Sequence, residues 1–304
     1  MLKIPPSQPL APAPRPQNSN PDEAPGQTVK VEALGTNFLL DLPASPTFAA
    51  NPTLSRPIIA NTAGDAVTLA NNSTFSGFII NNPTGDGIFG NAAQNVSIND
   101  IAINGAGASA IFLQNTLGTT SISNATITSL AGATDAVVHI DGGSGQISFN
   151  SSDKYLLGSI SNTSAQEALL VENMTGGRFT MSSSSVSDTG GGLGVVIQNN
   201  SGGSATVDNL TVTNGIGTGI SILNSAGTYT FTKSSTQLQS IAITGTAQQG
   251  ILISGLTGSA QFSAAVDIND RLAGGIEVTG SSGAVTFSDD VSLLNQLGAG
   301  SEAA

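Results

Sequence analysis

Three aspartates in the first third of the chain are the residues whose types and spacing best suit chemistry. Asp65 and Asp86 each stand two residues before an apolar residue, and Asp100 follows in the next segment. If the segments stack, Asp65 and Asp86 lie about one strand spacing apart, ~4.8 Å. The carboxyl groups of a retaining glycosidase lie at a similar separation, about 5–5.5 Å. The alternative, which we favour, is that each aspartate opens a turn, as in TAGDAV and PTGDGI.

The sequence contains few other residues that suit catalysis or metal binding. The sole histidine, His139, is followed by Ile140 and is expected to be a surface strand residue. The absence of cysteine excludes disulfides and thiolate metal sites. We expect no cofactor; Ca²⁺ is the one ion that the carboxylates leave open, and it requires several converging oxygens.

The charge pattern bears on partners. The net charge is −12 and the eight Lys and Arg residues are scattered, whereas nucleic acid binding needs clustered basic residues. We therefore expect no nucleic-acid partner. No run of 18 apolar residues exists, so we expect no membrane insertion of this segment as a helix.

A repeat positions these residues. The nonapeptides AIFLQNTLG (110–118), GISILNSAG (219–227) and GILISGLTG (250–258) share one pattern of apolar and turn residues. Nine units align, with spacings of 21 to 31 residues, and such a period marks a repeat architecture. The first apolar residues, the anchors, are Val67, Ile88, Ile111, Val138, Leu169, Val195, Ile220, Ile251 and Ile276.

Within each unit the residue types predict strands and turns. An apolar residue usually returns two positions after the anchor, which is the period of a strand with one inward face. Residues that tolerate a left-handed backbone follow. Together, the strand period and the turn residues predict an all-β fold, a single-stranded parallel β-helix (solenoid) of about nine coils. One turn column lies four positions after the anchors (Asn71, Ala92, Asn115, Gly142, Asn173, Asn199, Asn224, Gly255 and Gly280), and a second contains Gly77, Asp100, Asn124 and Asn209.

The residue after each anchor is expected to point out of the coil. Phe89, Phe112, Leu170 and Val196 occupy this position and would form an exposed apolar stripe, which is typical of a binding surface. The alternative is that an inter-coil connection, or the segment 28–60, covers them.

The ends differ from the repeat. Residues 1–27 are Pro-rich and predict a disordered linker, 28–60 an N-terminal cap or incomplete coil, and 61–304 the β-helix. Inserts at 141–164 and 228–247 hold the only two tyrosines, Tyr155 and Tyr229, and are expected to supply a groove wall. The start lacks the apolar region of a signal peptide. The chain is therefore expected to be either cytoplasmic or a segment of a longer exported protein, and we favour the second.

Units such as NNSTFSGFIINNPTGDGIFGNAAQNVSINDIAINGAG (71–107) resemble those of the right-handed parallel β-helix superfamily, over about 58–297. That group includes pectate-lyase-like enzymes, phage tailspikes and passenger regions of bacterial surface proteins. The resemblance implies the right hand of the coil. The pectate lyases of that superfamily need a basic residue beside acidic Ca²⁺ ligands. In this chain, basic residues almost never share a coil face with acidic clusters.

The leading expectation is therefore a non-catalytic extracellular β-helix module, a stalk or adhesin-like segment of a larger bacterial surface or secreted protein. Its partners would be a carbohydrate or protein on the lateral face, and neighbouring modules of a longer chain. The alternative is a polysaccharide-active hydrolase or lyase that uses Asp65, Asp86 and Asp100.

Overall fold

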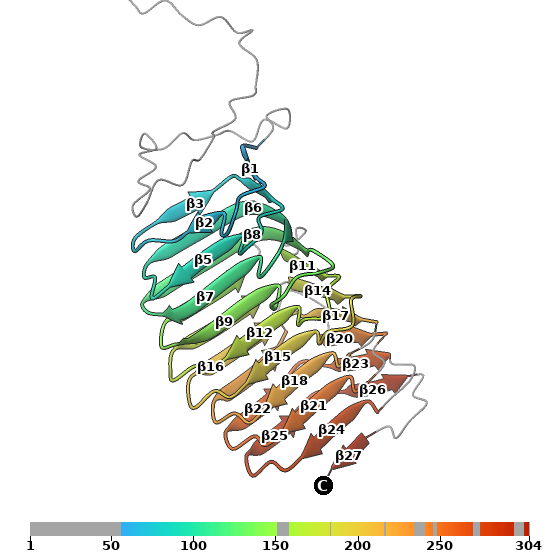
Figure 1. The fold of residues 1–304 in the computed structure, drawn as a ribbon. Helices are drawn as coiled ribbons and strands as arrows, with labels where there is room; N and C mark the ends of the chain where they lie inside the picture. The colour runs from blue at the N-terminus through green and yellow to red at the C-terminus, as the bar shows by residue number, and fades with distance from the viewer. Residues whose placement is uncertain are drawn as a thin grey trace, which may run out of the picture.

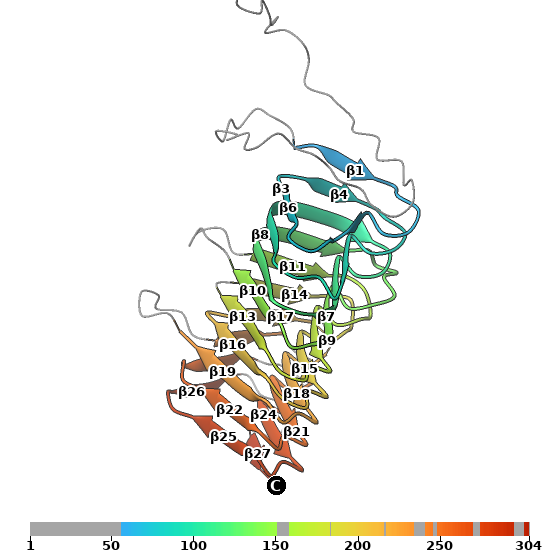
Figure 2. The same ribbon diagram turned by 90° about the vertical axis from the view of Figure 1, so that its left-hand side faces the viewer.

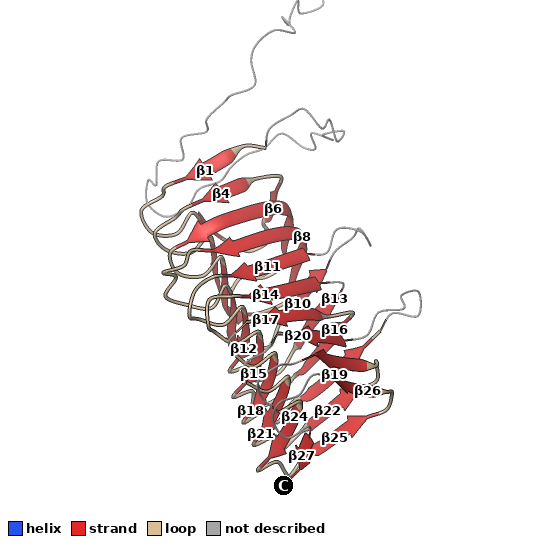
Figure 3. Ribbon diagram, turned by 90° about the vertical axis from the view of Figure 1, so that its right-hand side faces the viewer, coloured by secondary structure: helices blue, strands red, loops and turns tan. Residues whose placement is uncertain are grey.

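The chain winds into an all-β solenoid whose parallel strands stack from one coil to the next (Figure 1). The structure is a computed structural model that describes residues 56–150, 158–182, 184–215, 217–233, 241–245, 248–269, 274–294 and 301–303. Strands and loops account for all of these residues, and none of them is helical (Figure 3). The predicted linker, 1–27, lies outside the described residues, and so does the predicted cap or incomplete coil, 28–60, up to residue 55. The last residues of that segment form β1 (Ile58–Ala60), which pairs in parallel with β4 (Ile79–Asn81).

One wall of the solenoid is a ten-stranded parallel sheet, here called sheet B. Each coil contributes one strand, and nine of the ten strands open with an anchor residue, while the last strand opens with Ser301 in the same file. The ladder is visible along the front of Figure 1. Its strands are β2 (Val67–Thr68), β5 (Ile88–Asn91), β7 (Ile111–Thr116), β9 (Val138–Gly143), β12 (Leu169–Glu172), β15 (Val195–Gln198), β18 (Ile220–Leu223), β21 (Ile251–Ser254), β24 (Ile276–Thr279) and β27 (Ser301–Ala303).

The opposite wall is a 17-stranded sheet, sheet A, to which each coil contributes two strands around a corner. Figure 2 shows these strands stacked along the solenoid. β6 (Val96–Ala106) and β8 (Thr119–Ser129) run through the corner unbroken. The strands before the corner are β3 (Thr74–Ser76), β10 (Gln146–Asn150), β13 (Arg178–Ser182), β16 (Ser204–Asp208), β19 (Thr228–Thr232), β22 (Ser259–Phe262) and β25 (Ala284–Phe287), and those after it are β1 (Ile58–Ala60), β4 (Ile79–Asn81), β11 (Gly158–Asn162), β14 (Ser184–Asp188), β17 (Thr211–Asn214), β20 (Ile241–Thr244), β23 (Val266–Asn269) and β26 (Val291–Leu294).

Parallel pairing places all nine anchor residues in one file, which confirms the alignment of the repeats. The first pair is Val67 with Ile88 and the last is Ile251 with Ile276, and the pairs between them follow the same register. The solenoid has about eight turns, not the nine expected. The count differs because nine anchors bound only eight complete repeats.

The predicted left-handed turns explain where each coil bends. Ala92 has a φ of 52° although its residue type breaks the pattern. In the first unit the prediction is one residue off, since Asn72, not Asn71, has a positive φ. The other members of the first column are confirmed at Asn115, Gly142, Asn173, Asn199, Asn224, Gly255 and Gly280, and the whole second column at Gly77, Asp100, Asn124 and Asn209.

Apolar side chains fill the interior between the two sheets. Phe231, Phe262 and Phe287 are register partners in successive coils, and their rings stack with centroids 4.5 and 4.6 Å apart. Burial of a side chain of this size contributes roughly 1.5–3 kcal/mol. Close stacking of the coils also requires glycine at Gly258, because a Cβ there would clash with the Gly227 carbonyl oxygen of the preceding coil.

The central parts of the two inserts, 151–157 and 234–240, lie outside the described residues, so the expected groove wall stays a prediction. Tyr229 lies in β19 and is buried in the core, because its position matches the inward face of the strand. Tyr155 lies outside the described residues.

Candidate functional site

The outer face of sheet B holds an aromatic and ionisable cluster. Phe89, Phe112 and His139 are register partners on β5, β7 and β9. The two phenylalanine ring centroids lie 5.5 Å apart, and His139 stacks on Phe112 at 4.7 Å. Both phenylalanines are half-buried, so this part of the predicted stripe remains partly accessible.

The stripe does not stay exposed further along the solenoid. Leu170 and Val196 are 6% and 1% exposed. Ala136 packs with them, and Leu193 adds to the same small cluster, which is separate from the interior core. Ala136 and Leu193 stand two residues before their anchors, so the inter-coil connections cover the stripe. Leu170 and Val196 therefore follow the alternative prediction, in which an inter-coil connection covers the stripe.

His139 was expected at the surface, and this expectation is wrong, since the residue is only 8% exposed. Its Nδ1 lies 2.9 Å from Asp135 Oδ2 and its Nε2 lies 3.1 Å from Glu172 Oε1. A carboxylate at each nitrogen requires both nitrogens to donate, which is the protonated form. Although burial opposes it, the two carboxylates raise the pKa of His139 above its ordinary 6.5. Such a ring has no free lone pair to act as a base or a metal ligand.

Asp65 and Asp86 lie in one column on neighbouring coils, as the spacing predicts. The Asp86 backbone N–H donates to Asp65 Oδ1 at 2.9 Å, and the Ser109 N–H donates to Asp86 Oδ1 at 2.9 Å. Each aspartate therefore bridges to the next coil. Burial raises the pKa of Asp86 to about 6, against the Ser109 hydrogen bond that lowers it, and Asp65 and Asp135 add repulsion.

Asp100 belongs to a different part of the molecule. It lies in β6 of sheet A at a left-handed corner, with a φ of 52°. Its carboxylate forms an ion pair with Arg56. The structure thus brings Asp65 and Asp86 together but places Asp100 on the other sheet.

Carboxylates of sheet B are also held by amides of neighbouring coils. Gln114 Nε2 and Asn173 Nδ2 donate to the two oxygens of Asp141, at 3.1 and 2.8 Å. Gln198 Nε2 donates to Glu172 Oε2 at 2.8 Å. Among the residues that the structure describes, no group of three or more His, Cys, Asp or Glu is arranged to hold a metal ion.

A further buried carboxylate, that of Asp188, lies at the end of β14 in sheet A, where the connection to β15 begins. Asn162 Nδ2 donates to Asp188 Oδ2 at 3.0 Å, and the Gly190 N–H donates to Asp188 Oδ1 at 3.1 Å. Burial raises the pKa of Asp188. The bond from Asn162 joins neighbouring coils and the bond from Gly190 fixes the local turn, which assigns Asp188 a structural role.

The outer face of sheet A is chemically different. One file of register partners there consists only of uncharged polar residues, and we call this file the hydroxyl face. It contains Thr74, Ser97, Ser121, Ser148, Thr180, Thr206, Thr230, Gln261 and Thr286.

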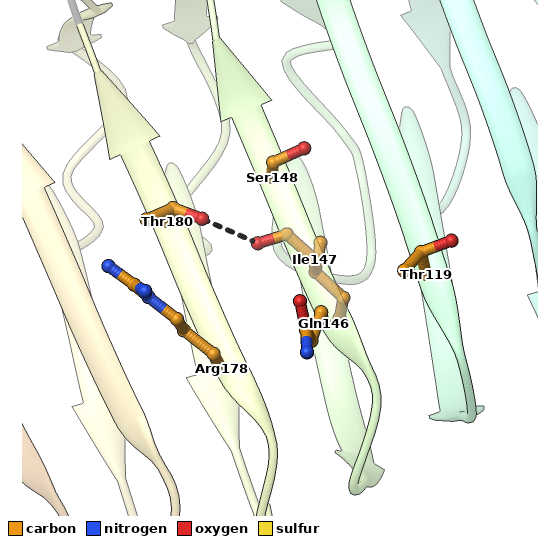
Figure 4. A pocket seen from close by; sticks show the side chains of 6 residues that line it. All are labelled: Thr119, Gln146, Ile147, Ser148, Arg178 and Thr180. Atoms are coloured by element: carbon orange, nitrogen blue, oxygen red, sulfur yellow. Dashed lines mark hydrogen bonds between the residues drawn. The ribbon is translucent and has the colours of Figure 1, made fainter.

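A shallow depression of about 290 Å³ lies on this face, across β8, β10 and β13 (Figure 4). In its wall Thr180 Oγ1 donates to the Ile147 carbonyl at 3.3 Å, and Arg178 Nη2 donates to Thr206 Oγ1 at 3.4 Å. Arg178 is exposed and is the only charged residue of the wall. The lining residues are Thr119, Gln146, Ile147, Ser148, Arg178 and Thr180.

The sequence reasoning missed Asp135 and Glu172, which are the partners of His139. Asp135 stands three residues before an anchor and Glu172 three residues after the next. Alignment of all outward positions, not only the one after the anchor, would have placed them beside His139.

Comparisons with family models, with curated proteins and with solved structures found no match to this chain. In the part of the chain that the structure describes, no helix is long and apolar enough to cross a membrane. The class of protein that the fold defines is therefore a parallel β-solenoid.

Proposed function

We propose that the protein is a non-catalytic extracellular module, a stiff stalk or adhesin-like segment of a larger bacterial surface or secreted protein. In this proposal the coil is right-handed, like those of the parallel β-helix superfamily that it resembles. One observation carries the proposal: the anchors from Val67 to Ile276 form an unbroken interior file. Coils that add in register extend the molecule in one direction, as a rod does.

The candidate carboxylates already bind other groups of the same chain, which supports a mechanical role. Asp65 and Asp86 accept backbone N–H groups of the following coil, and Asp100 is paired with Arg56. A retaining glycosidase instead needs two carboxyl groups facing a shared substrate. Here the aspartates serve the stacking of coils.

The hydroxyl face is the lateral surface that we propose for a carbohydrate or protein partner. Hydroxyl and amide side chains there offer both donors and acceptors, and sugars present the same groups. In the depression, Arg178 adds an exposed cation. The net charge of −12 and the scattered basic residues argue against nucleic acid.

The test is incubation of the full chain with a panel of acidic and neutral polysaccharides. Binding without reducing ends or unsaturated products supports the proposal, and Arg178→Ala should weaken that binding. The matched control is Lys233→Ala, an exposed cation that pairs with Asp289. Turnover of any member of the panel would contradict a non-catalytic role.

A polysaccharide hydrolase or lyase is the second candidate, favoured by one observation. Asp86 has a pKa of about 6, which suits a carboxylic acid that gives up a proton near neutral pH. The half-buried rings of Phe89 and Phe112 lie on the next strands of the same sheet. Asp86→Asn keeps an oxygen to accept the Ser109 N–H, so it should fold. Turnover by the wild type that this variant abolishes would establish the second candidate.

A further inference from the structure

His139 connects three parts of the solenoid. Asp135 lies in the connection before β9, His139 lies in β9, and Glu172 lies in β12 of the next coil. Glu172 in turn accepts from Gln198 of β15, so the chain of contacts reaches a further coil. Since the chain contains a single histidine, this is the one place where an imidazole links coils.

The backbone of the connection that carries Asp135 is hydrogen-bonded to neighbouring coils on both sides of Ala136, and the Thr134 N–H donates to the Gly107 carbonyl at 3.1 Å. The Ala136 N–H donates to Asp135 Oδ1 at 2.7 Å, and the Val137 N–H donates to the Glu167 carbonyl at 2.9 Å. Ala136 packs on Leu170 and Val196. Between these backbone bonds Asp135 holds the Ala136 N–H, so its position affects how Ala136 packs over this part of the stripe.

We propose that Asp135, His139 and Glu172 form a pH-sensitive clamp that holds the connection before β9 against sheet B while the imidazole is protonated. A neutral imidazole has one N–H, so one of its two nitrogens becomes an acceptor that faces a carboxylate. One charge-assisted hydrogen bond is lost and the remaining contact is repulsive. Above its titration midpoint the clamp loosens, and Ala136 exposes Leu170.

The charged surroundings of His139 are all acidic in the described residues that pack against it. Asp135 and Glu172 contact it directly, and Asp86 also acts on it across the coil. Asp141 lies two residues along β9, but its oxygens accept from Gln114 and Asn173. Burial opposes the charged ring, but Asp135 and Glu172 favour it, and together they hold the pKa of His139 above 6.5.

The test is an NMR titration of the full chain with ring-labelled histidine, which gives one signal. We expect a midpoint above 6.5, with the Ala136 amide and the Leu170 methyl signals following the same curve. Hydrogen exchange at Ala136 and Val137, corrected for the intrinsic pH effect, should accelerate by about tenfold across the midpoint, as the loss of a charged hydrogen bond implies. The amides of Ile220 and Ile222 are the internal reference.

Variants separate the clamp from a merely buried histidine. Asp135→Asn and Glu172→Gln should each lower the midpoint, and Asp141→Asn, a carboxylate on the same strand without a bond to His139, should lower it less. A wild-type midpoint at or below 6.5 would overturn the proposal, and this result does not depend on whether the variants fold. Equal shifts in all three variants, or Ala136 and Leu170 signals that ignore the titration, would overturn it as well.

Discussion

The outer faces of the two sheets differ although the same coils build both. On sheet A, the hydroxyl face repeats one kind of uncharged side chain from Thr74 to Thr286. On sheet B, neighbouring coils are joined by charges and rings at Phe112, His139 and Glu172. The interior file and the turn columns are common to both. Coil stacking is therefore set by the interior and the turns, which leaves each outer face free to carry its own chemistry.

The largest effect should come from the interior that both faces share. Phe231→Ala should lower the free energy of unfolding by about 3–5 kcal/mol, because it removes the fully buried first ring of a stacked file. Thr230→Ala, its neighbour on the hydroxyl face, should change it by at most about 0.5 kcal/mol. Denaturant unfolding measures both. Similar losses for the two variants would place Phe231 outside the core.

A smaller effect should distinguish the two outer faces. His139→Gln removes a cation that two carboxylates contact and should cost about 1.5–3 kcal/mol. Thr206→Ala, at an equally central position of sheet A, should cost at most about 0.5 kcal/mol. If thermal unfolding showed the two variants to be equally stable, the charged links of sheet B would not couple the coils.

The faces should also differ in their response to pH, since the residues of the hydroxyl face carry no titratable group, whereas His139 lies on sheet B. The pKa of His139 is raised above 6.5, so its contribution is complete below 6.5 and is lost as the pH rises through the folded value. The raised pKa of Asp86, about 6 against an ordinary 3.8, acts in the same direction between those values. The lowered pKa of Asp135 acts oppositely, and its contribution is lost as the pH falls below 3.8.

Stability should therefore decline as the pH rises from about 4 through 6 and beyond 6.5. Denaturant midpoints across this range measure the trend. In the double variant His139→Gln with Asp86→Asn the decline should shrink to the part that the raised pKa of Asp188 contributes. Persistence of the full decline in that variant would assign the pH dependence to other groups.

The smallest effect concerns a turn that serves both sheets. Ala92 adopts a φ of 52°, which costs a residue with a Cβ about 1–2 kcal/mol. Ala92→Asn should stabilise the protein by roughly 1 kcal/mol, because asparagine tolerates this conformation. Asn115→Ala, the reverse change in the next coil, should destabilise it by a similar amount. Thermal unfolding of the pair tests whether the turn column acts through its backbone.

The fold was largely predictable because its repeat is carried by backbone geometry. Anchors at Ile111, Ile220 and Ile251 recur with turn residues at a fixed offset, and this offset defines the register. The turn at Asn72 was displaced by one residue because Asn71 and Asn72 are both suited to it. Ala92 shows that stacking imposes the left-handed turn even where the residue type opposes it.

The site was less predictable because it depends on contacts between coils. Asp65 and Asp86 followed from the anchor spacing alone. The burial of His139 did not, since it requires Asp135 from an irregular connection and Glu172 from another coil. The burial of Val196 likewise depends on Leu193, in a connection whose length varies from unit to unit.

Disulfide formation between engineered cysteines tests the stacking of coils most directly, because the chain has no cysteine of its own. Thr206 and Thr230 are register partners in adjacent coils, and parallel neighbours lie within the Cα separation of a disulfide. The variant with cysteine at both positions should oxidise rapidly to the intramolecular disulfide. A control pair at Ser204 and Thr232, at opposite ends of the same two strands, should not. Equal oxidation of the two pairs, or none in the first, would contradict the parallel in-register solenoid.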